Sequence, residues 1–391
     1  MPRIRTLVLI LAGGAGGRLE LLTHSRAKPA VSFAGTHRLI DFALSNCLNS
    51  GIDDVWISQQ FNPVSLSDHV ANGRPWDLDR TVGGLLVLHP RQGNDDRDGF
   101  PQGTADALWR SAELIREFDP AALVVVSADA VYKLDYAALV EEHCAAGKPV
   151  TLVTTEVDPD DAGRYGVVQA DGDDVRGYAY KPEEPEGNLI ANEVFVFEPG
   201  HVLDALDELA ERGGDLEDLG HELLPQLVEA GDVRRHHFDG YWRDVGTIAA
   251  YWDCHMELVG DDPPIDLDEP AWPIVTVARS NRASGRICAD ARVVSALLAP
   301  GATVAGTVEH SVVGRGARVE AGAVVRESVL LPGSVVRAGA VVERAIVDDG
   351  VVIGRQARVG EAGGEIALVG MQAVIEDGAR LGAGARFPDE G

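Results

Sequence analysis

Residues 7–18, LVLILAGGAGGR, join a continuous apolar run to a loop of small residues that ends in an arginine. The run from Leu7 to Leu11 has the length of one buried strand, and the next six positions hold four glycines and two alanines. Because such a loop has no bulky side chains, its backbone N–H groups can approach and bind an anion. Arg18 follows directly, and Arg26 and Lys28 lie close by. This segment therefore predicts a strand that delivers a phosphate-binding loop.

Apolar strands alternate with helical stretches through residues 1–260. The patterns predict strands at 5–11, 54–58, 122–127 and 149–155, helices at 37–50, 104–117 and 135–147, and two more helices within 199–231. This alternation favours an α/β domain with a Rossmann-like, mostly parallel sheet. In such sheets, ligands bind at the carboxyl ends of the strands.

The pattern changes after residues 261–274, an acidic and proline-rich stretch that we interpret as a linker. In residues 275–391, aliphatic residues recur every six positions, at Val313, Val319, Val325 and Leu331 and, in a second frame, at Val329, Val335, Val341, Val347, Ile353 and Val359. This period predicts a left-handed parallel β-helix (hexapeptide repeat) domain. We expect a scaffold. The alternative, an acyltransferase with a histidine base, would have to use His310, the one histidine after residue 275.

The composition excludes several classes of partner. The 391 residues carry a formal net charge of −28, which argues against nucleic acid and anionic membranes. No run of 18 apolar residues occurs, so we expect no membrane span, and four scattered cysteines favour a cytoplasmic protein. The first 40 residues nevertheless hold six cations and one acid, as an anion site requires. Only four of the 34 basic residues are lysine, so a lysine marks a place that needs a compact ammonium group.

Longer strings resemble one family closely. LAGG-x-G-x-RL at 11–19, RAKPA at 26–30 and RLIDFALSNCLNSG at 38–51 are similar to the glucose-1-phosphate adenylyltransferase family of sugar-phosphate nucleotidyltransferases. GTADA at 103–107 and YWRDVGT at 241–247 match strings of the same family. The resemblance implies that ATP and α-D-glucose 1-phosphate react to ADP-glucose and pyrophosphate, for synthesis of glycogen or another α-glucan.

The resemblance also implies roles for individual residues. Arg18 would bind the triphosphate and stabilise the departing pyrophosphate, and Lys28 would assist at the phosphates. Asp129, which follows the predicted strand 122–127, and Asp244 would hold Mg²⁺, a cation that prefers carboxylate oxygens. Nucleotide contacts map to Leu11, Ala12, Gly13, Gly14, Gly16, Gln60, Gly103 and Thr104, and sugar-phosphate contacts map to Gly166 and Lys181. The helix expected to begin at Thr104 either favours an anion through its dipole or uses Thr104 as an ordinary cap.

The chain departs from the family pattern at positions near these contacts. Tyr180 replaces a glutamate before Lys181, Ala128 and Ala130 flank Asp129 where Gly and His are usual, and Pro101 stands before the GTADA string. Ala15 replaces a charged residue in the glycine loop. These departures leave open a different nucleotide or sugar 1-phosphate, or a non-catalytic regulatory paralogue. The resemblance further implies a homo-oligomer, commonly a tetramer, which would cover the sheet edges of the β-helix.

Overall fold

The computed structural model describes residues 4–14, 16–90, 99–213, 216–277 and 283–389. The chain forms two compact units. Unit 1 comprises residues 1–15, 42–63 and 70–242, and unit 2 comprises residues 16–41, 64–69 and 243–391. This division differs from the domains predicted at 1–260 and 275–391, because residues 16–41, 64–69 and 243–274 belong to the same unit as the β-helix. Within the predicted linker, Ile265 and Ile274 are buried.

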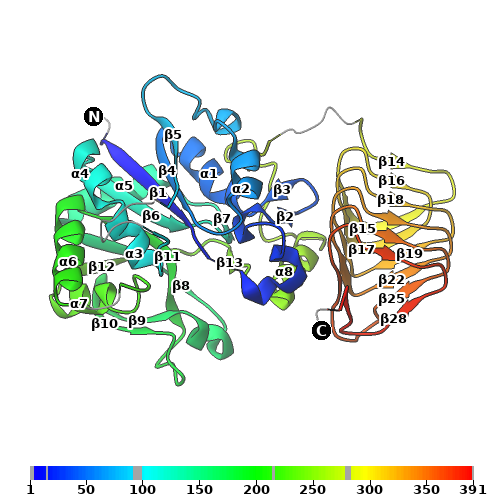
Figure 1. Ribbon diagram of the computed structural model, residues 1–391. Coiled ribbons are helices and arrows are strands. Elements are labelled where there is room, and N and C mark those ends of the chain that lie inside the picture. Colours follow the sequence, from blue (N-terminus) through cyan, green and yellow to red (C-terminus); the bar gives the residue numbers. More distant parts are fainter. Residues whose placement is uncertain (1–3, 15, 91–98, 214–215, 278–282, 390–391) are drawn as a thin grey trace. The chain divides into compact units, whose positions relative to one another are not determined.

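Unit 1 is built on a nine-stranded sheet in the order β5-β4-β1-β6-β11-β8-β12-β10-β9 (Figure 1). Strands β5 (Gly84–Leu88), β4 (Asp54–Gln59), β1 (Thr6–Ala12) and β6 (Ala122–Ser127) run parallel. Of these four, β4, β1 and β6 were predicted and β5 was not. The other strands are β11 (Leu189–Phe197), β8 (Val150–Glu156), β12 (Val233–His237), β10 (Asp174–Tyr180) and β9 (Gly166–Asp171). Apart from the parallel pair β8–β12, these strands pair antiparallel, so the sheet is mixed.

Helices cover this sheet. They are α1 (Ile40–Asn49), α3 (Thr104–Arg110), α4 (Ala112–Phe118), α5 (Tyr136–Ala146), α6 (Pro199–Glu211) and α7 (Leu223–Glu229). A further helix, α2 (Pro63–Val70), belongs mostly to unit 2, which includes residues 64–69. Apolar side chains of α3, α4, α6 and α7 pack with Leu9 and Val125 in one core. The single helix predicted at 104–117 is two helices, because the Ser111 hydroxyl donates to the Ala107 carbonyl at 2.8 Å and competes with the helical hydrogen bonds.

Unit 2 contains a parallel β-helix whose coils each contribute short strands to its faces (Figure 1). Its strands are β14 (Arg286–Ile287), β15 (Arg292–Leu298), β16 (Thr303–Val304), β17 (Thr307–Val313), β18 (Arg318–Val319), β19 (Val324–Arg326), β20 (Val329–Leu330), β21 (Val335–Val336), β22 (Val341–Glu343), β23 (Ala345–Val347), β24 (Val352–Ile353), β25 (Arg358–Val359), β26 (Ala367–Val369), β27 (Val374–Ile375), β28 (Arg380–Leu381) and β29 (Arg386–Phe387). Its other elements include the 3-10 turns η1 (Gly17–Thr23) and η2 (Lys28–Ala30), the hairpin strands β2 (Ser32–Phe33) and β3 (His37–Arg38), and α8 (Ile248–Leu258).

The stacking of the coils corrects the predicted six-residue frame. Val319 pairs with Val336 and Val336 with Ile353, so the coils there repeat every 17 residues. The interior residues are Val319, Val325, Leu330, Val336, Val342, Val347, Ile353 and Val359. One step in each coil therefore spans five residues, as from Val325 to Leu330. The frame is wrong at Val329, Val335 and Val341, which lie one position before interior residues, and at Leu331, which lies one position after Leu330.

The five-residue step turns a corner of the β-helix. His310, Glu327 and Arg344 occupy this corner in successive coils with φ values of 46°, 43° and 48°. Buried serines support it, since Ser311 Oγ accepts from the Ser328 N–H and Ser328 Oγ accepts from the Ala345 N–H, both at 3.1 Å. Because glutamate and arginine fill the equivalent positions, the location of His310 supports a structural role rather than that of a base.

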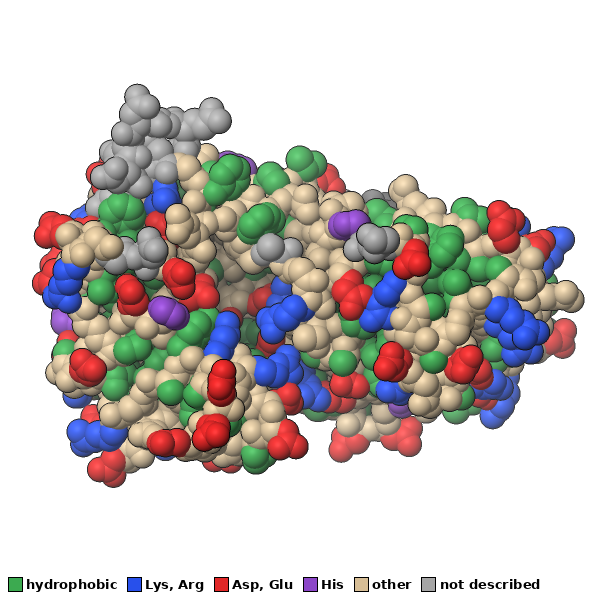
Figure 2. Space-filling view, turned by 60° about the horizontal axis from the view of Figure 1, so that its bottom comes forward, with side chains coloured by type: hydrophobic (Ala, Val, Ile, Leu, Met, Phe, Trp, Pro, Cys, Tyr) green, Lys and Arg blue, Asp and Glu red, His purple; other side chains and the backbone are tan. Residues whose placement is uncertain are grey.

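The surface agrees with the acidic composition. Figure 2 shows Asp and Glu side chains spread over the visible face, with Lys and Arg between them. None of the described helices is both long and apolar enough to cross a membrane. The four cysteines form no disulfide in the described structure.

A buried histidine in unit 2 predicts a pH-dependent stability. His255 Nε2 accepts from the Ala34 N–H at 3.0 Å, and burial lowers the pKa of His255 to about 4. Between this value and the ordinary pKa of 6.5, the unfolded chain binds the proton and the folded chain does not, so stability falls as the pH is lowered. We expect His255 to account for a loss of about 2 kcal/mol between pH 7 and pH 5. Urea unfolding of the wild type and His255→Gln at both pH values measures this. An equal pH dependence in the two proteins would contradict it.

Candidate active site

The carboxyl ends of β1 and β4 place the glycine loop beside Gln60. Leu11 and Ala12 end β1 and pair with Ser58 and Gln59 of β4. A Cβ on Gly13 would lie 3.0 Å from Gln60 Oε1, whereas one on Gly14 would meet only open space. Gln60 Nε2 donates to the Pro101 carbonyl, so Gln60 and the segment before α3 are joined. The structure thus brings Leu11, Ala12, Gly13, Gly14 and Gln60 to one edge of unit 1; Ala15 lies outside the described residues.

Asp129 lies at the same edge, directly after β6. Leu11 pairs with Ser127, and the Ala128 N–H donates to the Leu11 carbonyl at 3.2 Å. The Ser127 hydroxyl donates to the Asp129 carboxylate, which is partly exposed. Ala128 and Ala130, the two departures beside it, are buried in the core. The strand end therefore presents a carboxylate next to the glycine loop.

Unit 2 holds a second group of predicted residues, Gly16, Arg18, Lys28 and Asp244. Gly16 has a φ of 69°, and a Cβ there would lie 2.8 Å from Thr23 Cγ2 and 3.1 Å from Lys28 Cβ. Lys28 is nearly buried, and its Nζ lies 3.5 Å from Asp244 Oδ1. A Cβ on Gly246 would lie 2.7 Å from Asp244 Oδ2 and 3.3 Å from Arg18 Nη2, so Arg18 approaches the same place. Two cations therefore flank one carboxylate.

The residues present fit a hard divalent cation with few protein ligands. Each unit offers a carboxylate that could serve as a ligand of such a cation: Asp129 in unit 1 and Asp244 in unit 2. Across the described residues, no three or more His, Cys, Asp or Glu side chains form a group that could hold a metal. Mg²⁺ is commonly bound by one or two carboxylates together with water and substrate phosphates, and does not need a larger protein cage.

The predicted sugar-phosphate residues meet where β9 and β10 pair in unit 1. Gly166 pairs with Tyr180, and a Cβ on Gly166 would lie 2.1 Å from Tyr178 Oη, so only glycine leaves room for that tyrosine. Lys181 has a φ of 46°, and its Nζ donates to Tyr180 Oη at 2.7 Å. Gly166 and Lys181 are therefore brought together around two tyrosines.

Tyr180, which replaces the family's glutamate, hydrogen-bonds to another carboxylate. Tyr180 Oη donates to Asp218 Oδ2 at 2.7 Å. Burial raises the pKa of Asp218, but hydrogen bonds from Tyr180 and Thr104 lower it more, so the pKa lies below its ordinary value. Burial and the Asp218 carboxylate raise the pKa of Tyr180, which keeps its hydroxyl protonated. The ionised carboxylate of Asp218 therefore remains near Lys181, although Tyr180 replaces the family's glutamate.

Thr104 takes part in this network rather than in an open helix terminus. The Thr104 N–H donates to Asp218 Oδ1 at 3.2 Å, and the Thr104 hydroxyl accepts from the Leu219 N–H at 2.9 Å. A Cβ on Gly103 would lie 2.3 Å from the Glu217 carbonyl oxygen. Both residues therefore fix the 217–219 loop against α3. Of the two sequence interpretations, this geometry favours a structural role for Thr104, because its N–H already donates to the Asp218 carboxylate.

Two polar residues of this region were not predicted. Asn192 is 1% exposed on β11, and neither its Nδ2 nor its Oδ1 has a hydrogen-bond partner among the described residues. Its neighbour Ala191 pairs with Gly166. The break in the apolar run LIANEVFVF could have revealed Asn192, since a buried polar side chain without a partner is costly. Asp218 gave no signal, because it is one of 62 acidic residues and lies in a loop.

Comparison with known proteins shows the family to which the chain belongs. Residues 7–260 match the nucleotidyl transferase family, and residues 282–365 match the GlmU-like C-terminal hexapeptide family. The chain is 37% identical to a glucose-1-phosphate adenylyltransferase of Pseudothermotoga lettingae, over 97% of this chain and 93% of the relative. The chain belongs to the glucose-1-phosphate adenylyltransferase family.

Other members of the family align over most of the chain. The Thermosipho melanesiensis glucose-1-phosphate adenylyltransferase is 38% identical over 96% of this chain and 94% of the relative. The Bacillus licheniformis enzyme of the same name is 37% identical over 78% of this chain and 81% of the relative. The chain is therefore a sugar-1-phosphate nucleotidyltransferase with a hexapeptide-repeat domain, and nucleotidyltransferases of this family generally use a divalent metal.

Proposed function

We propose that this protein converts ATP and α-D-glucose 1-phosphate into ADP-glucose and pyrophosphate, with Mg²⁺ as the metal, for glycogen or α-glucan synthesis. The observation that carries the proposal is the group of Lys28, Asp244 and Arg18 in unit 2, which offers two cations and one carboxylate to a triphosphate and its metal. Similarity to glucose-1-phosphate adenylyltransferases over almost the whole chain supports the choice of substrates.

The chemistry requires little covalent participation by the protein. A phosphate oxygen of the sugar phosphate attacks the α-phosphorus of ATP, a new P–O bond forms, and the bond to the β-phosphate oxygen breaks with release of pyrophosphate. Positioning and charge stabilisation supply most of the catalysis in such transfers. Mg²⁺ held by Asp129 and Asp244 would neutralise the phosphate oxygens. Arg18 and Lys28 stabilise the charge that accumulates on the pyrophosphate.

The glycine loop binds ATP, and the residues around Tyr178 and Tyr180 bind the sugar phosphate. Gly13, Gly14 and Gly16 let the ATP phosphates approach the backbone, and Gln60 with Gly103 lies on the side of the base. Lys181 binds the sugar phosphate beside Gly166. The Asn192 amide and the Asp218 carboxylate supply hydrogen bonds to sugar hydroxyls, which compensates for the glutamate replaced by Tyr180.

The orphaned amide of Asn192 predicts opposite effects on stability and substrate binding. Asn192→Leu keeps the side-chain size and removes buried polar atoms, so we expect the free energy of unfolding to rise by about 1 kcal/mol. The variant loses a partner for a sugar hydroxyl, and we expect the KM for the sugar phosphate to rise about 10-fold while the KM for ATP is unchanged. Urea unfolding and initial rates measure both effects.

Asn188 offers a matched control for this variant. Asn188 Nδ2 donates to the Val157 carbonyl at 3.0 Å, so Asn188→Leu removes a satisfied hydrogen bond and should lower stability without changing either KM. A loss of stability in Asn192→Leu, or an unchanged KM for the sugar phosphate, would show that the amide has a structural partner and no substrate role.

A substrate panel tests the proposed specificity. Pyrophosphate release is measured with Mg²⁺ and with ATP, GTP, UTP or dTTP, each combined with glucose, mannose or glucosamine 1-phosphate. We expect the highest kcat/KM for ATP with glucose 1-phosphate. A higher kcat/KM for another combination would support nucleotidyl transfer with different substrates. This outcome matters because Tyr180, which replaces the family's glutamate, hydrogen-bonds to Asp218. Mn²⁺ and Ca²⁺ in place of Mg²⁺ test the metal.

We also propose a cytoplasmic homo-oligomer, a tetramer by analogy with the family. Exposed apolar side chains on the β-helix support association, since Ile287 and Val374 are more than half exposed. Light scattering coupled to size-exclusion chromatography gives the mass directly, and a monomeric mass would refute the proposal.

A further inference from the structure

The chain segment that carries the phosphate-binding cations belongs to the β-helical unit. Residues 16–41 contain Arg18 and Lys28 and group with residues 243–391. Residues 20–32 of this segment contact three successive coils of the β-helix, at their turns and strands. Most of these contacts are ion pairs and hydrogen bonds rather than apolar packing. The β-helix is therefore placed to determine where Lys28 lies.

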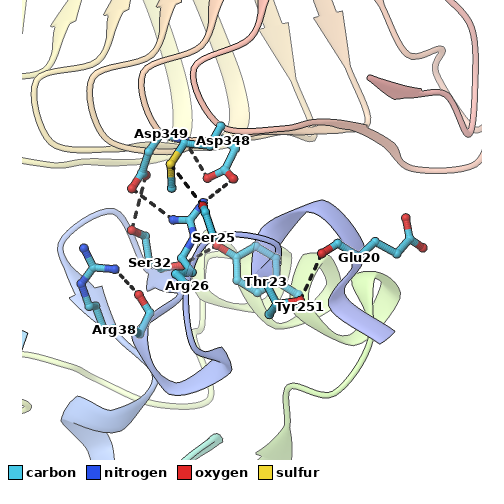
Figure 3. A network of polar contacts seen from close by, with 11 residues as sticks. Glu20, Thr23, Ser25, Arg26, Ser32, Arg38, Tyr251, Asp348 and Asp349 are labelled. Carbon is cyan, nitrogen blue, oxygen red and sulfur yellow. Dashed lines mark hydrogen bonds and ion pairs between the residues drawn. The ribbon is translucent and has the colours of Figure 1, made fainter. Parts of the chain in front are cut away.

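The first contact is a buried ion pair. Arg26 is 3% exposed and Asp348, in the turn after β23, is fully buried. Arg26 Nη2 pairs with Asp348 Oδ2, and Arg26 Nη1 lies 3.1 Å from Asp349 Oδ2 (Figure 3). Ser32 Oγ donates to the other Asp349 oxygen at 3.4 Å. A guanidinium held between two carboxylates has one preferred orientation, so this contact fixes the chain two residues before Lys28.

The second contact is made by Glu20, which follows Arg18 by two residues. Arg386 of β29 forms an ion pair with Glu20, with its Nη2 3.2 Å from Glu20 Oε1. Glu20 has a φ of 47°, a strained conformation that persists only where the surroundings hold it. Arg386 also donates to the Ile366 carbonyl at 2.7 Å, which fixes the guanidinium on the β-helix.

The turn after β26 supplies the third contact, between these two ion pairs. Ser25 Oγ lies 3.5 Å from Met371 Sδ, and a Cβ on Gly370 would lie 3.4 Å from the Leu21 side chain. The turns and strand at Asp348, Gly370 and Arg386 thus contact residues on both sides of Thr23, whose hydroxyl donates to the Gly16 carbonyl at 3.0 Å. Through Thr23, the segment held by these contacts is joined to Gly16 at the end of the glycine loop.

We propose that Asp348, Asp349 and Arg386 are positioning residues for nucleotidyl transfer, acting through Arg26 and Glu20 on Lys28 and Arg18. The proposal rests on the function proposed above. It assigns the β-helix an indirect part in binding the triphosphate, because displacement of a phosphate-binding cation by about 1 Å weakens catalysis. The sugar-phosphate residues Gly166, Lys181 and Asn192 belong to unit 1, so their binding of sugar phosphate should not change.

Kinetics of Asp348→Asn and Glu20→Gln test the proposal. We expect each variant to raise the KM for ATP about 10-fold and to leave the KM for glucose 1-phosphate within about twofold. Glu20→Gln keeps the test available if Asp348→Asn folds poorly, because Glu20 is partly exposed. Glu309→Gln is the control, since it removes a carboxylate paired with Arg326 on an exposed face of the same β-helix. Equal changes in both KM values, or none, would overturn the proposal.

Hydrogen–deuterium exchange separates this proposal from the proposed function. Peptides that cover residues 16–32 should exchange faster in Asp348→Asn than in the wild type and Glu309→Gln. If the wild type shows no turnover, the proposed function fails, while faster exchange still supports the anchoring of this segment. Unchanged exchange in an active Asp348→Asn enzyme would overturn the positioning role alone.

Discussion

Asp129→Asn should slow nucleotidyl transfer about 1,000-fold, because the substitution removes one of the two proposed metal ligands from a reaction between polyanions. Asparagine keeps the size of the side chain and can still accept from the Ser127 hydroxyl. We therefore expect an unchanged melting temperature. Raising the Mg²⁺ concentration should recover part of the activity, since a neutral amide binds the metal more weakly than a carboxylate.

Asp160→Asn is the matched control for Asp129→Asn. Asp160 is an exposed aspartate of the 3-10 turn at Pro159–Arg164 and has the same charge. Its replacement should leave kcat unchanged. If Asp129→Asn keeps most of the wild-type rate at every Mg²⁺ concentration, Asp129 is not a metal ligand, and the buried alanines around it would then mark a changed site.

Lys28→Ala should lower kcat/KM for ATP about 100-fold, the effect expected when one charged donor to a developing anion is removed. Lys28 is 7% exposed and its Nζ lies 3.5 Å from Asp244 Oδ1, so the proposed phosphate-binding cation also neutralises a proposed metal ligand. Lys28→Arg should recover little activity. A planar guanidinium cannot replace a compact ammonium in this tightly packed place, where Gly16 already has no room for a Cβ.

Lys148→Ala provides the lysine control. Lys148 donates to the Gly231 carbonyl in unit 1 and is partly exposed, so its loss should not change kcat/KM. Full activity in Lys28→Arg would show that any cation suffices at this position, and the scarcity of lysine in the chain would then carry no functional meaning.

The central strands were predictable because buried parallel strands consist of uninterrupted apolar residues. The run Ala122–Ser127 forms β6 at the predicted residues, and the loop after Leu11 follows β1 as expected. Local patterns were insufficient where a side chain competes with the backbone. Ser111 divides the helix predicted at 104–117 in this way, and no count of apolar residues reveals it.

The β-helix was predictable as an architecture but not in its register. A period of six describes the strands, whereas the five-residue corner at Glu327 shifts the interior from Val329 to Leu330. Valine occurs on both sides of these short strands, so the sequence alone could not show which valine points inward. The packing of Leu330 and Val347, which pair with each other in successive coils, in one interior core decides it.

The sequence revealed the residues of the candidate site that lie in short contiguous strings, such as Arg18 and Lys28. It could not reveal the pairing of Arg26 with Asp348, which joins residues 322 positions apart. Nor could it reveal that Asp218 occupies the N–H of Thr104, since that contact depends on a loop near α7. Long-range polar contacts need the fold before they can be recognised.

The most direct test of the proposed reaction is ³¹P NMR of the wild-type protein with ATP, glucose 1-phosphate and Mg²⁺. The proposal predicts ADP-glucose and pyrophosphate in equal amounts, and their conversion back to ATP when pyrophosphate is added. Formation of ADP and inorganic phosphate, or no change in the substrates with folded protein, would contradict it.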